Sequence, residues 1–212
     1  MKIKNTWKEL LVIHGLEYDL MEIKIEVQEK NIKNKFHEYS GRTLESYIKK
    51  YQRKFPNIII QNFSKLERGM RLGEFLKKCG TDIYKNSFLN PYGDKPFCKF
   101  SVKMDRFKKI SGLYFFEFND ELIYIGMSIN LYARFKNGYC NISPYNCYTN
   151  GQSTNCKVNS NLNNLFKKGG EVKLYILPLN MARKEIKQHE TNLIEDAIDK
   201  EYELWNSQHV KK

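Results

Sequence analysis

Glu190 is the acidic residue of this sequence whose position most strongly suggests chemistry. Four apolar residues form one arc of a helix drawn over residues 181–199 at about 100° per residue: Ile186, Leu193, Ile194 and Ala197. Glu190 falls in the middle of that arc, so its carboxylate faces the core. Burying an unpaired carboxylate is costly, so such a group normally protonates, pairs with a cation or binds a metal. Two interpretations follow: a metal ligand, or a salt bridge to Arg134 or to a lysine.

One arginine and two tyrosines ahead of Glu190 are further candidates, and of these the arginine is suited to a phosphate group. Arg134 carries a fixed charge on a planar fork, although an arginine on an amphipathic helix is commonly a plain surface residue. Tyr114 and Tyr124 fall on neighbouring predicted strands, where two phenols can meet on one sheet face or can simply pack. Free tyrosine has a pKa of about 10 and is a poor base at neutral pH unless a nearby cation lowers it.

A hairpin, three helices and a third strand are expected to position these side chains. Residues 112–118 and 121–126 are strand-like runs joined by Asn119-Asp120, which is typical of a hairpin. The later elements are predicted as a helix, a short helix, a strand and a long helix: residues 131–135, 162–166, 171–177 and 181–199. This order predicts an α/β (α+β) fold with a small three-stranded, mainly antiparallel sheet flanked by helices. Residues 21–28 alternate apolar and polar and form either a strand or part of a helix.

Basic charge is concentrated in the first half of the chain. The 212 residues include 36 Lys+Arg and 24 Asp+Glu, a net charge of +12. Such a surplus is typical of nucleic-acid-binding proteins, although a merely soluble basic surface also produces it. Residues 1–109 hold 24 of the basic and 13 of the acidic residues, so nearly all of the surplus lies there. We therefore expect DNA binding in the first half and any chemistry in the second.

Composition also limits where the protein works. No apolar run approaches the ~20 residues that cross a bilayer, and the first residues lack the apolar stretch of a secretory signal. The five cysteines are odd in number and include no Cys-x-x-Cys pair, which argues against a disulfide framework. We expect no membrane association and a cytoplasmic location.

Two stretches divide the chain. Residues 90–96 contain two prolines and one glycine, which favours a domain boundary close behind them, so residues 1–109 are predicted as a basic, mainly helical extension. Residues 110–212 form the second domain. Asparagine, serine, cysteine and glycine replace the apolar periodicity over residues 137–161, which predicts a long inserted loop.

One helix of the extension is a candidate DNA contact. Apolar residues recur at helical spacing from Leu44 to Phe55, and Pro56 stops the pattern. Four basic residues line the opposite face: Lys49, Lys50, Arg53 and Lys54. The segment is either an ordinary surface helix or one that enters a DNA groove.

The hairpin carries a sequence signature. Gly112-Leu113-Tyr114 on one strand is followed by Tyr124-Ile125-Gly126 on the other, with ten residues from Tyr114 to Tyr124 and ten more to Arg134. Glu190 and Asn206 follow in order. This five-part pattern, over about residues 110–206, resembles the GIY-YIG nucleases and implies their core fold.

The resemblance implies a role for each residue of the pattern. Tyr114 would orient or deprotonate the attacking water, and Tyr124 would assist at the same phosphate. Arg134 would stabilise the developing charge, and Glu190 would hold one divalent metal, Mg²⁺ or Mn²⁺. Asn206 would support the site.

The sequence departs from the family pattern at two places near the site. Many members have a lysine after Tyr-Ile-Gly, where this chain has Met127. Many have His or Tyr four residues after the arginine, where Gly138 stands; Tyr139 is one place further and is a candidate substitute or DNA contact.

In this chain a basic region precedes the nuclease pattern. That arrangement is most similar to the type II restriction endonucleases of this family. These cut both strands of double-stranded DNA at a short symmetric site, commonly as homodimers. Two alternatives remain open: a homing or structure-selective repair nuclease with the same chemistry, and a non-catalytic DNA-binding protein on the same scaffold.

Overall fold

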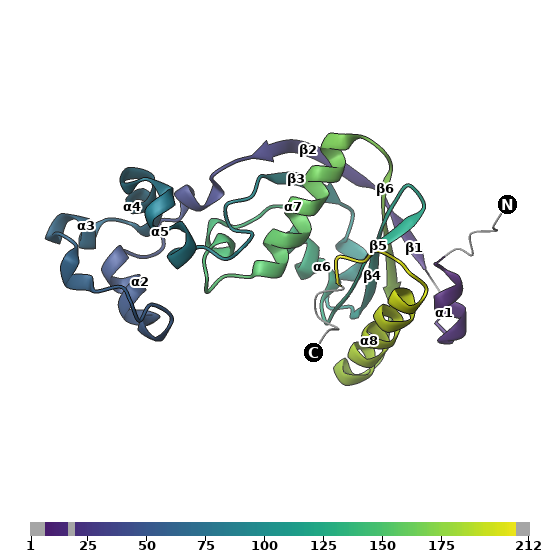
Figure 1. The fold of residues 1–212 in the computed structure, drawn as a ribbon. Coiled ribbons are helices and arrows are strands. Elements are labelled where there is room, and N and C mark those ends of the chain that lie inside the picture. Colours follow the sequence, from purple (N-terminus) through teal and green to yellow (C-terminus); the bar gives the residue numbers. More distant parts are fainter. Residues whose placement is uncertain (1–6, 17–19, 207–212) are drawn as a thin grey trace. The chain divides into compact units, whose positions relative to one another are not determined.

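The computed structural model describes residues 7–16 and 20–206 of the chain. Over these residues the protein is a mixed α/β structure with eight α-helices and two antiparallel sheets, of four and two strands (Figure 1). The chain divides by packing into two compact units. Unit 1 comprises Met1–Gln28, Phe100–Cys140 and Asn164–Lys212, and unit 2 comprises Glu29–Lys99 and Asn141–Asn163.

The elements are labelled in chain order. The strands are β1 (Met21–Ile23), β2 (Ile25–Ile32), β3 (Phe97–Val102), β4 (Gly112–Phe118), β5 (Glu121–Ser128) and β6 (Val172–Pro178). The α-helices are α1 (Glu9–Ile13), α2 (Leu44–Lys50), α3 (Lys65–Gly69), α4 (Leu72–Cys79), α5 (Thr81–Phe88), α6 (Leu131–Arg134), α7 (Ser153–Lys168) and α8 (Arg183–Asp199). Short 3₁₀ turns connect them: η1 (Lys35–Glu38), η2 (Gln52–Lys54), η3 (Ile60–Asn62), η4 (Asp105–Phe107) and η6 (Pro144–Cys147).

The predicted hairpin forms β4 and β5. Asn119 and Asp120 adopt φ angles of 49° and 65°, which is the left-handed conformation that a two-residue hairpin turn requires. The register of the hairpin shifts between Phe116 and Glu117. On the side of the shift away from the turn, Tyr114 lies opposite Gly126. Because strand residues alternate between faces, Tyr114, Phe116 and Tyr124 share one face.

The sheet of unit 1 is covered differently on its two faces. Leu113, Phe115 and Ile125 pack in one apolar cluster with residues of α1 and α8. On the other face, the aromatic rings of β4 contact Phe135 and Tyr139, which follow α6. The face that carries the candidate site is therefore an aromatic layer beneath a short helical turn.

The sheet has four strands in the order β1-β6-β4-β5, so the prediction of three strands was wrong. Met21, Glu22 and Ile23 pair with Ile176, Tyr175 and Leu174 of β6, all antiparallel. The sequence pattern of residues 21–28 allows either a strand or a helix. Residues 21–23 form a strand because they pair with the free edge of β6. β5 remains at the opposite edge of the sheet.

The predicted loop over residues 137–161 was wrong for residues 153–161, because α7 begins at Ser153. Helix α7 buries asparagines, which obscure its apolar periodicity in the sequence. Asn159 accepts a hydrogen bond from the Cys98 N–H at 2.9 Å and donates one to the Cys98 carbonyl at 2.9 Å. The polar side chain of Asn159 thus completes the backbone hydrogen bonding of β3 at Cys98. The polar composition of this segment therefore does not indicate a loop.

Unit 2 contains α2 to α5 around a core rich in aromatic residues. Leu44, Tyr47 and Ile48 of α2 are buried in that core. The basic residues of the predicted helix lie on its exposed side or in the following turn η2: Lys49, Lys50, Arg53 and Lys54. The amphipathic pattern is confirmed, although the α-helix ends at Lys50.

The packing units differ from the division at residue 109 that the sequence suggested. The N-terminal residues belong to unit 1, because Trp7 stacks on Phe115 with ring centroids 5.0 Å apart and donates a hydrogen bond to Glu117. His14 likewise lies 2.7 Å from the carboxylate of Asp196. A division of function between residues 1–109 and 110–212 stays a prediction.

Candidate active site

Tyr114 and Gly126 are matched across the β4/β5 pair. The Tyr114 ring lies over the position where a side chain at Gly126 would stand: a Cβ there would be 2.5 Å from the Tyr114 hydroxyl oxygen and 2.6 Å from Cε2. Gly112, at the start of β4, similarly faces the carbonyl oxygen of Leu177 with no room for a Cβ. The two glycines of the signature are therefore required by close packing against the sheet itself.

Tyr139 joins Tyr114 at the centre of the aromatic layer. Both side chains are buried, and their hydroxyl oxygens are 2.7 Å apart. Residues Phe135–Tyr139 form a π-helical turn, closed by a hydrogen bond from the Cys140 N–H to the Phe135 carbonyl at 3.0 Å. A π turn accommodates one more residue than an α turn. The turn brings Tyr139, five places after Arg134, to the site. In the GIY-YIG pattern the corresponding residue stands four places after the arginine.

Tyr139 was also a candidate DNA contact, which stays a prediction, and its side chain is buried. Its side chain is 0% exposed, and its hydroxyl is occupied by Tyr114. A surface contact to DNA needs an accessible side chain. In this structure Tyr139 lies in the interior of the candidate site.

Arg134 lies beside these phenols at the end of α6. Its Cζ is 5.7 Å from the centroid of the Tyr139 ring, and the residue is half-buried. Burial opposes the charged form, but attraction to Tyr114, Tyr139, Tyr124 and Glu190 outweighs it and raises the pKa of the guanidinium above its ordinary value. Arg134 therefore brings a permanent positive charge to the site.

The three phenols are held in their neutral form. Burial raises the pKa of Tyr114 well above its usual range, and Tyr139 and Tyr124 act in the same direction. Burial is also the largest cause of the raised pKa of Tyr124 and of Tyr139. With the surroundings that the chain itself provides, these side chains can donate hydrogen bonds at neutral pH but do not accept a proton as a base.

Glu190 is buried in the apolar arc of α8 as predicted, with an exposed fraction of 8%. Its Oε1 accepts a hydrogen bond from the Met127 N–H at 3.0 Å, and its Oε2 lies 2.5 Å from the ammonium of Lys187. The carboxylate is therefore paired with a lysine one turn earlier on the same helix. Lys187 was not identified individually from the sequence, and its spacing of three residues before Glu190 is the signal for it.

The outer edge of β5 is completed by the C-terminal part of unit 1. The Trp205 N–H donates to the Ile123 carbonyl at 2.9 Å. The Asn206 side chain accepts from the Ile125 N–H at 3.0 Å and donates to the Ile125 carbonyl at 2.6 Å. Glu190 accepts from the Met127 N–H in the same way. The backbone of β5 is thus hydrogen-bonded on its outer side at Ile123, Ile125 and Met127. Asn206 therefore positions β5 through the backbone of Ile125.

One carboxylate fits a magnesium ion that is shared with a substrate phosphate. Mg²⁺ in proteins usually keeps several waters and takes one or two carboxylates together with phosphate oxygens. Glu190 supplies one such carboxylate, and the Lys187 side chain that covers it is 62% exposed, so it is free to move aside. The described residues contain no cluster of three or more acidic, histidine or cysteine side chains that would hold a metal without a substrate.

The residues predicted from the sequence fall into two groups. Six of them converge in unit 1, around the edge of the hairpin: Tyr114, Tyr124, Arg134, Tyr139, Glu190 and Asn206. The basic residues Lys49, Lys50, Arg53 and Lys54 lie in unit 2. Of these, Lys49 forms an ion pair with Glu45 at 2.6 Å on the surface of α2.

Comparisons with protein-family models, with curated proteins and with solved structures found no match to this chain. The geometry of the residues is thus the basis for assigning a function. Within the part of the chain that the structure describes, every helix is too short or too polar to cross a bilayer.

The contact between Tyr114 and Gly126 predicts the effect of a single methyl group. Gly126→Ala must displace the Tyr114 ring, so we expect a loss of about 1–3 kcal/mol in the free energy of unfolding, as for other overpacked cores. Urea unfolding measures the loss, and near-ultraviolet circular dichroism reports the change in tyrosine packing. Gly69→Ala is the matched control, because a Cβ there meets nothing within 4 Å. Equal stability of the two variants would contradict the packing described.

Proposed function

We propose that this protein is a GIY-YIG-type endonuclease that hydrolyses phosphodiester bonds of double-stranded DNA. The observation that carries the proposal is the convergence of one guanidinium, three neutral phenols and one buried carboxylate around the Tyr114–Gly126 contact. Charge, hydrogen-bond donors and a candidate metal ligand are the groups that phosphoryl chemistry requires. They come from the residues of the signature plus Tyr139.

Each group has a role that follows from its state in the protein. Hydrolysis adds water across a P–O bond and leaves one hydroxyl end and one phosphomonoester end. Arg134 stabilises the negative charge that builds up on the phosphate oxygens. The phenols of Tyr114 and Tyr124 orient the water and the phosphate by donating hydrogen bonds, because their raised pKa values make them poor bases. Glu190 would hold a Mg²⁺ ion, which would supply a water of lowered pKa and a counter-charge for the phosphate.

A type II restriction endonuclease is the branch that we propose. Unit 2 and its exposed basic residues interrupt the chain of unit 1, as expected if added segments hold the DNA around a small core. A single core has one Glu190 and one Arg134, so cutting both strands of a symmetric site requires two copies. We propose a homodimer on DNA as the active form. Homing or repair nucleases would instead require a long or a branched substrate.

A non-catalytic DNA-binding scaffold is the second candidate. The ion pair between Lys187 and Glu190 favours it, since a carboxylate paired in this way has a purely structural use in joining α8 to β5. The two functions differ in what they require of Glu190. A structural role requires an oxygen that accepts from Met127, whereas a metal-binding role requires the negative charge.

Glu190→Gln separates these roles, because glutamine keeps the acceptor oxygen and removes the charge. We expect Mg²⁺-dependent cleavage to fall by a factor of about 10² or more. DNA binding in Ca²⁺ should persist, and loss of the Lys187 ion pair should cost less than about 1 kcal/mol in the free energy of unfolding. Single-turnover cleavage, gel shift and urea unfolding give the three values.

Glu195→Gln is the control for Glu190→Gln, since Glu195 is an exposed acid of the same helix. It should cleave as the wild type does. Full Mg²⁺-dependent cleavage by the Glu190→Gln protein would refute the metal-binding role.

Tyr139→Phe tests whether the π-turn tyrosine takes part in the chemistry. The change keeps the ring packing and removes the hydroxyl that bonds Tyr114, so the Tyr114 hydroxyl loses its orientation. We expect the cleavage step to slow by about tenfold or more, with a loss of only about 1 kcal/mol in stability. The dissociation constant for DNA should be unchanged.

Tyr132→Phe is the matched control for Tyr139→Phe. Tyr132 lies on α6 and is half-buried, and its ring faces Lys108, whose ammonium is 5.1 Å from the centroid. We expect wild-type cleavage from this variant. If both variants cleave at the wild-type rate, Tyr139 has only a packing role.

A further inference from the structure

Tyr51 holds a half-buried phenol in unit 2, directly after α2. Its ring packs edge to face against the buried Tyr47, with the ring centroids 4.9 Å apart. Its hydroxyl oxygen is 3.0 Å from the hydroxyl oxygen of Tyr145, which lies in the turn η6 of the same unit. Two segments that are 94 residues apart in the sequence therefore hold this hydroxyl in place.

Two cations lie close to the Tyr51 hydroxyl. The ammonium of Lys50 is 5.5 Å from the centroid of the Tyr51 ring. A hydrogen bond from Tyr145 is the largest cause of the lowered pKa of Tyr51, and the charges of Lys50 and Arg42 act in the same direction. Hydrogen-bond donors and positive charge are thus gathered around one phenol oxygen.

The fold provides no counter-charge for these cations. Lys50 is exposed and Arg42 is half-buried, and neither forms an ion pair in the part of the chain that the structure describes. Glu45 is the acid of α2, and it is already paired with Lys49 at 2.6 Å. Two positive charges beside Tyr51 therefore remain available to an anion from outside the protein.

The hydrogen bonding around Tyr51 lacks an acceptor. A phenol can donate one hydrogen bond as well as accept one. Because Tyr145 donates to Tyr51, the Tyr51 proton has no acceptor among the described residues. An anion with several oxygens would accept from this phenol and from both cations at once. Phosphate groups have such oxygens, and arginine, lysine and tyrosine side chains are common donors to them.

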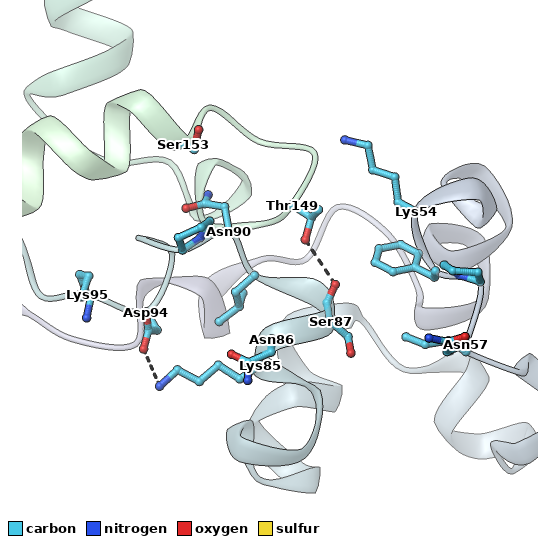
Figure 2. Close-up of a pocket in the computed structure, with 15 residues that line it drawn as sticks. Lys54, Asn57, Lys85, Asn86, Ser87, Asn90, Asp94, Lys95, Thr149 and Ser153 are labelled. Carbon is cyan, nitrogen blue, oxygen red and sulfur yellow. Dashed lines mark hydrogen bonds and ion pairs between the residues drawn. The ribbon is translucent and has the colours of Figure 1, made fainter. Parts of the chain in front are cut away.

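The cavity of unit 2 does not gather charge in this way. It has a volume of about 960 Å³ and is lined by parts of residues 54–58, 85–95 and 149–153. Figure 2 shows Lys54 and Lys95 on opposite sides of it, and Lys85 pairs with Asp94 at 2.5 Å. Its charges are therefore separated or paired, whereas those around Tyr51 act on a single oxygen.

We propose that Arg42, Lys50, Tyr51 and Tyr145 form a phosphate-binding site, which takes either a backbone phosphate of DNA or a free phosphate group. Arg42 and Lys50 neutralise the charge of the phosphate, and Tyr51 donates a hydrogen bond to one of its oxygens. Tyr145 positions the Tyr51 hydroxyl. The inference rests on the proposed endonuclease function only in naming DNA as a source. A contact of this kind would position DNA without reading its sequence.

The first arm of the test measures DNA binding by the full chain in EDTA. Fluorescence anisotropy with a short labelled duplex gives the dissociation constant at several salt concentrations. We expect Arg42→Ala/Lys50→Ala to weaken binding about tenfold or more. The slope of log affinity against log salt concentration should become shallower by about one, because one phosphate contact is lost.

Lys33→Ala/Lys65→Ala is the matched control, because it removes the same charge from exposed positions of unit 2. It should weaken DNA binding less than about threefold and leave the salt slope nearly unchanged.

Tyr51→Phe separates the hydroxyl from the charges, because phenylalanine keeps the ring packing. DNA binding should weaken about threefold or more, with an unchanged salt slope, since no charge is removed. Tyr84→Phe is its control. Tyr84 is a half-buried tyrosine of unit 2 that packs on Phe63 and Phe75, and this variant should bind DNA as the wild type does.

The second arm identifies the source of the phosphate by isothermal titration with orthophosphate. Weaker DNA binding by Arg42→Ala/Lys50→Ala than by the control assigns the site to the DNA backbone. Equal DNA binding by the two double variants, with orthophosphate binding lost only from Arg42→Ala/Lys50→Ala, assigns it to a free phosphate group. Equal behaviour of the two double variants toward both ligands would overturn the proposal.

Cleavage in Mg²⁺ is assayed separately from binding. A protein that binds DNA through this site and cuts none would refute the proposed endonuclease function but not this inference. Cleavage that persists when the two double variants bind both ligands equally would do the reverse.

Discussion

The position of the Tyr114 ring over Gly126 is the constraint on which the candidate site depends. It exists only in one pairing of β4 with β5, which the turn at Asn119-Asp120 and the register shift after Phe116 establish. A slip of one residue would turn Tyr114 toward the opposite face, against α8. With this pairing, the hydroxyl of Tyr114 reaches the hydroxyl of Tyr139. Arg134 lies beside the ring of Tyr139, which the π turn carries.

The edge of β5 connects that constraint to Glu190. An edge strand leaves backbone groups without partners, and here Trp205, Asn206 and Glu190 bond alternate residues of it. The carboxylate therefore has a structural contact through one oxygen, while the other is covered by the ammonium of Lys187. This arrangement places a carboxylate at the edge of the hairpin, with its side chain mostly buried. A substrate phosphate and its metal would compete with Lys187 for that charge.

Sequence reasoning predicted the parts of the fold that depend on local patterns. The hairpin, the buried arc of α8 and the helix around Tyr47 follow from periodicity and turn residues, and the structure contains them. Residues 21–23 were left open between a strand and a helix, because a three-residue edge strand is defined by its partner. Only residues 162–166 of α7 were predicted as helix, because the asparagines of its first part serve long-range backbone contacts. The place of Tyr139 was left open for a related reason: a π turn changes which residue faces the site, and the sequence does not reveal that turn.

We propose that the residues around Tyr114 and Gly126 cleave DNA at defined positions. Incubating plasmid and phage DNA with the full chain and Mg²⁺, and sequencing the ends produced, tests it most directly. The account predicts discrete fragments whose ends all fall at one short symmetric sequence, and no cleavage when Mg²⁺ is removed by a chelator. Intact DNA after incubation with folded protein and Mg²⁺, or cleavage that continues in the chelator, would contradict it.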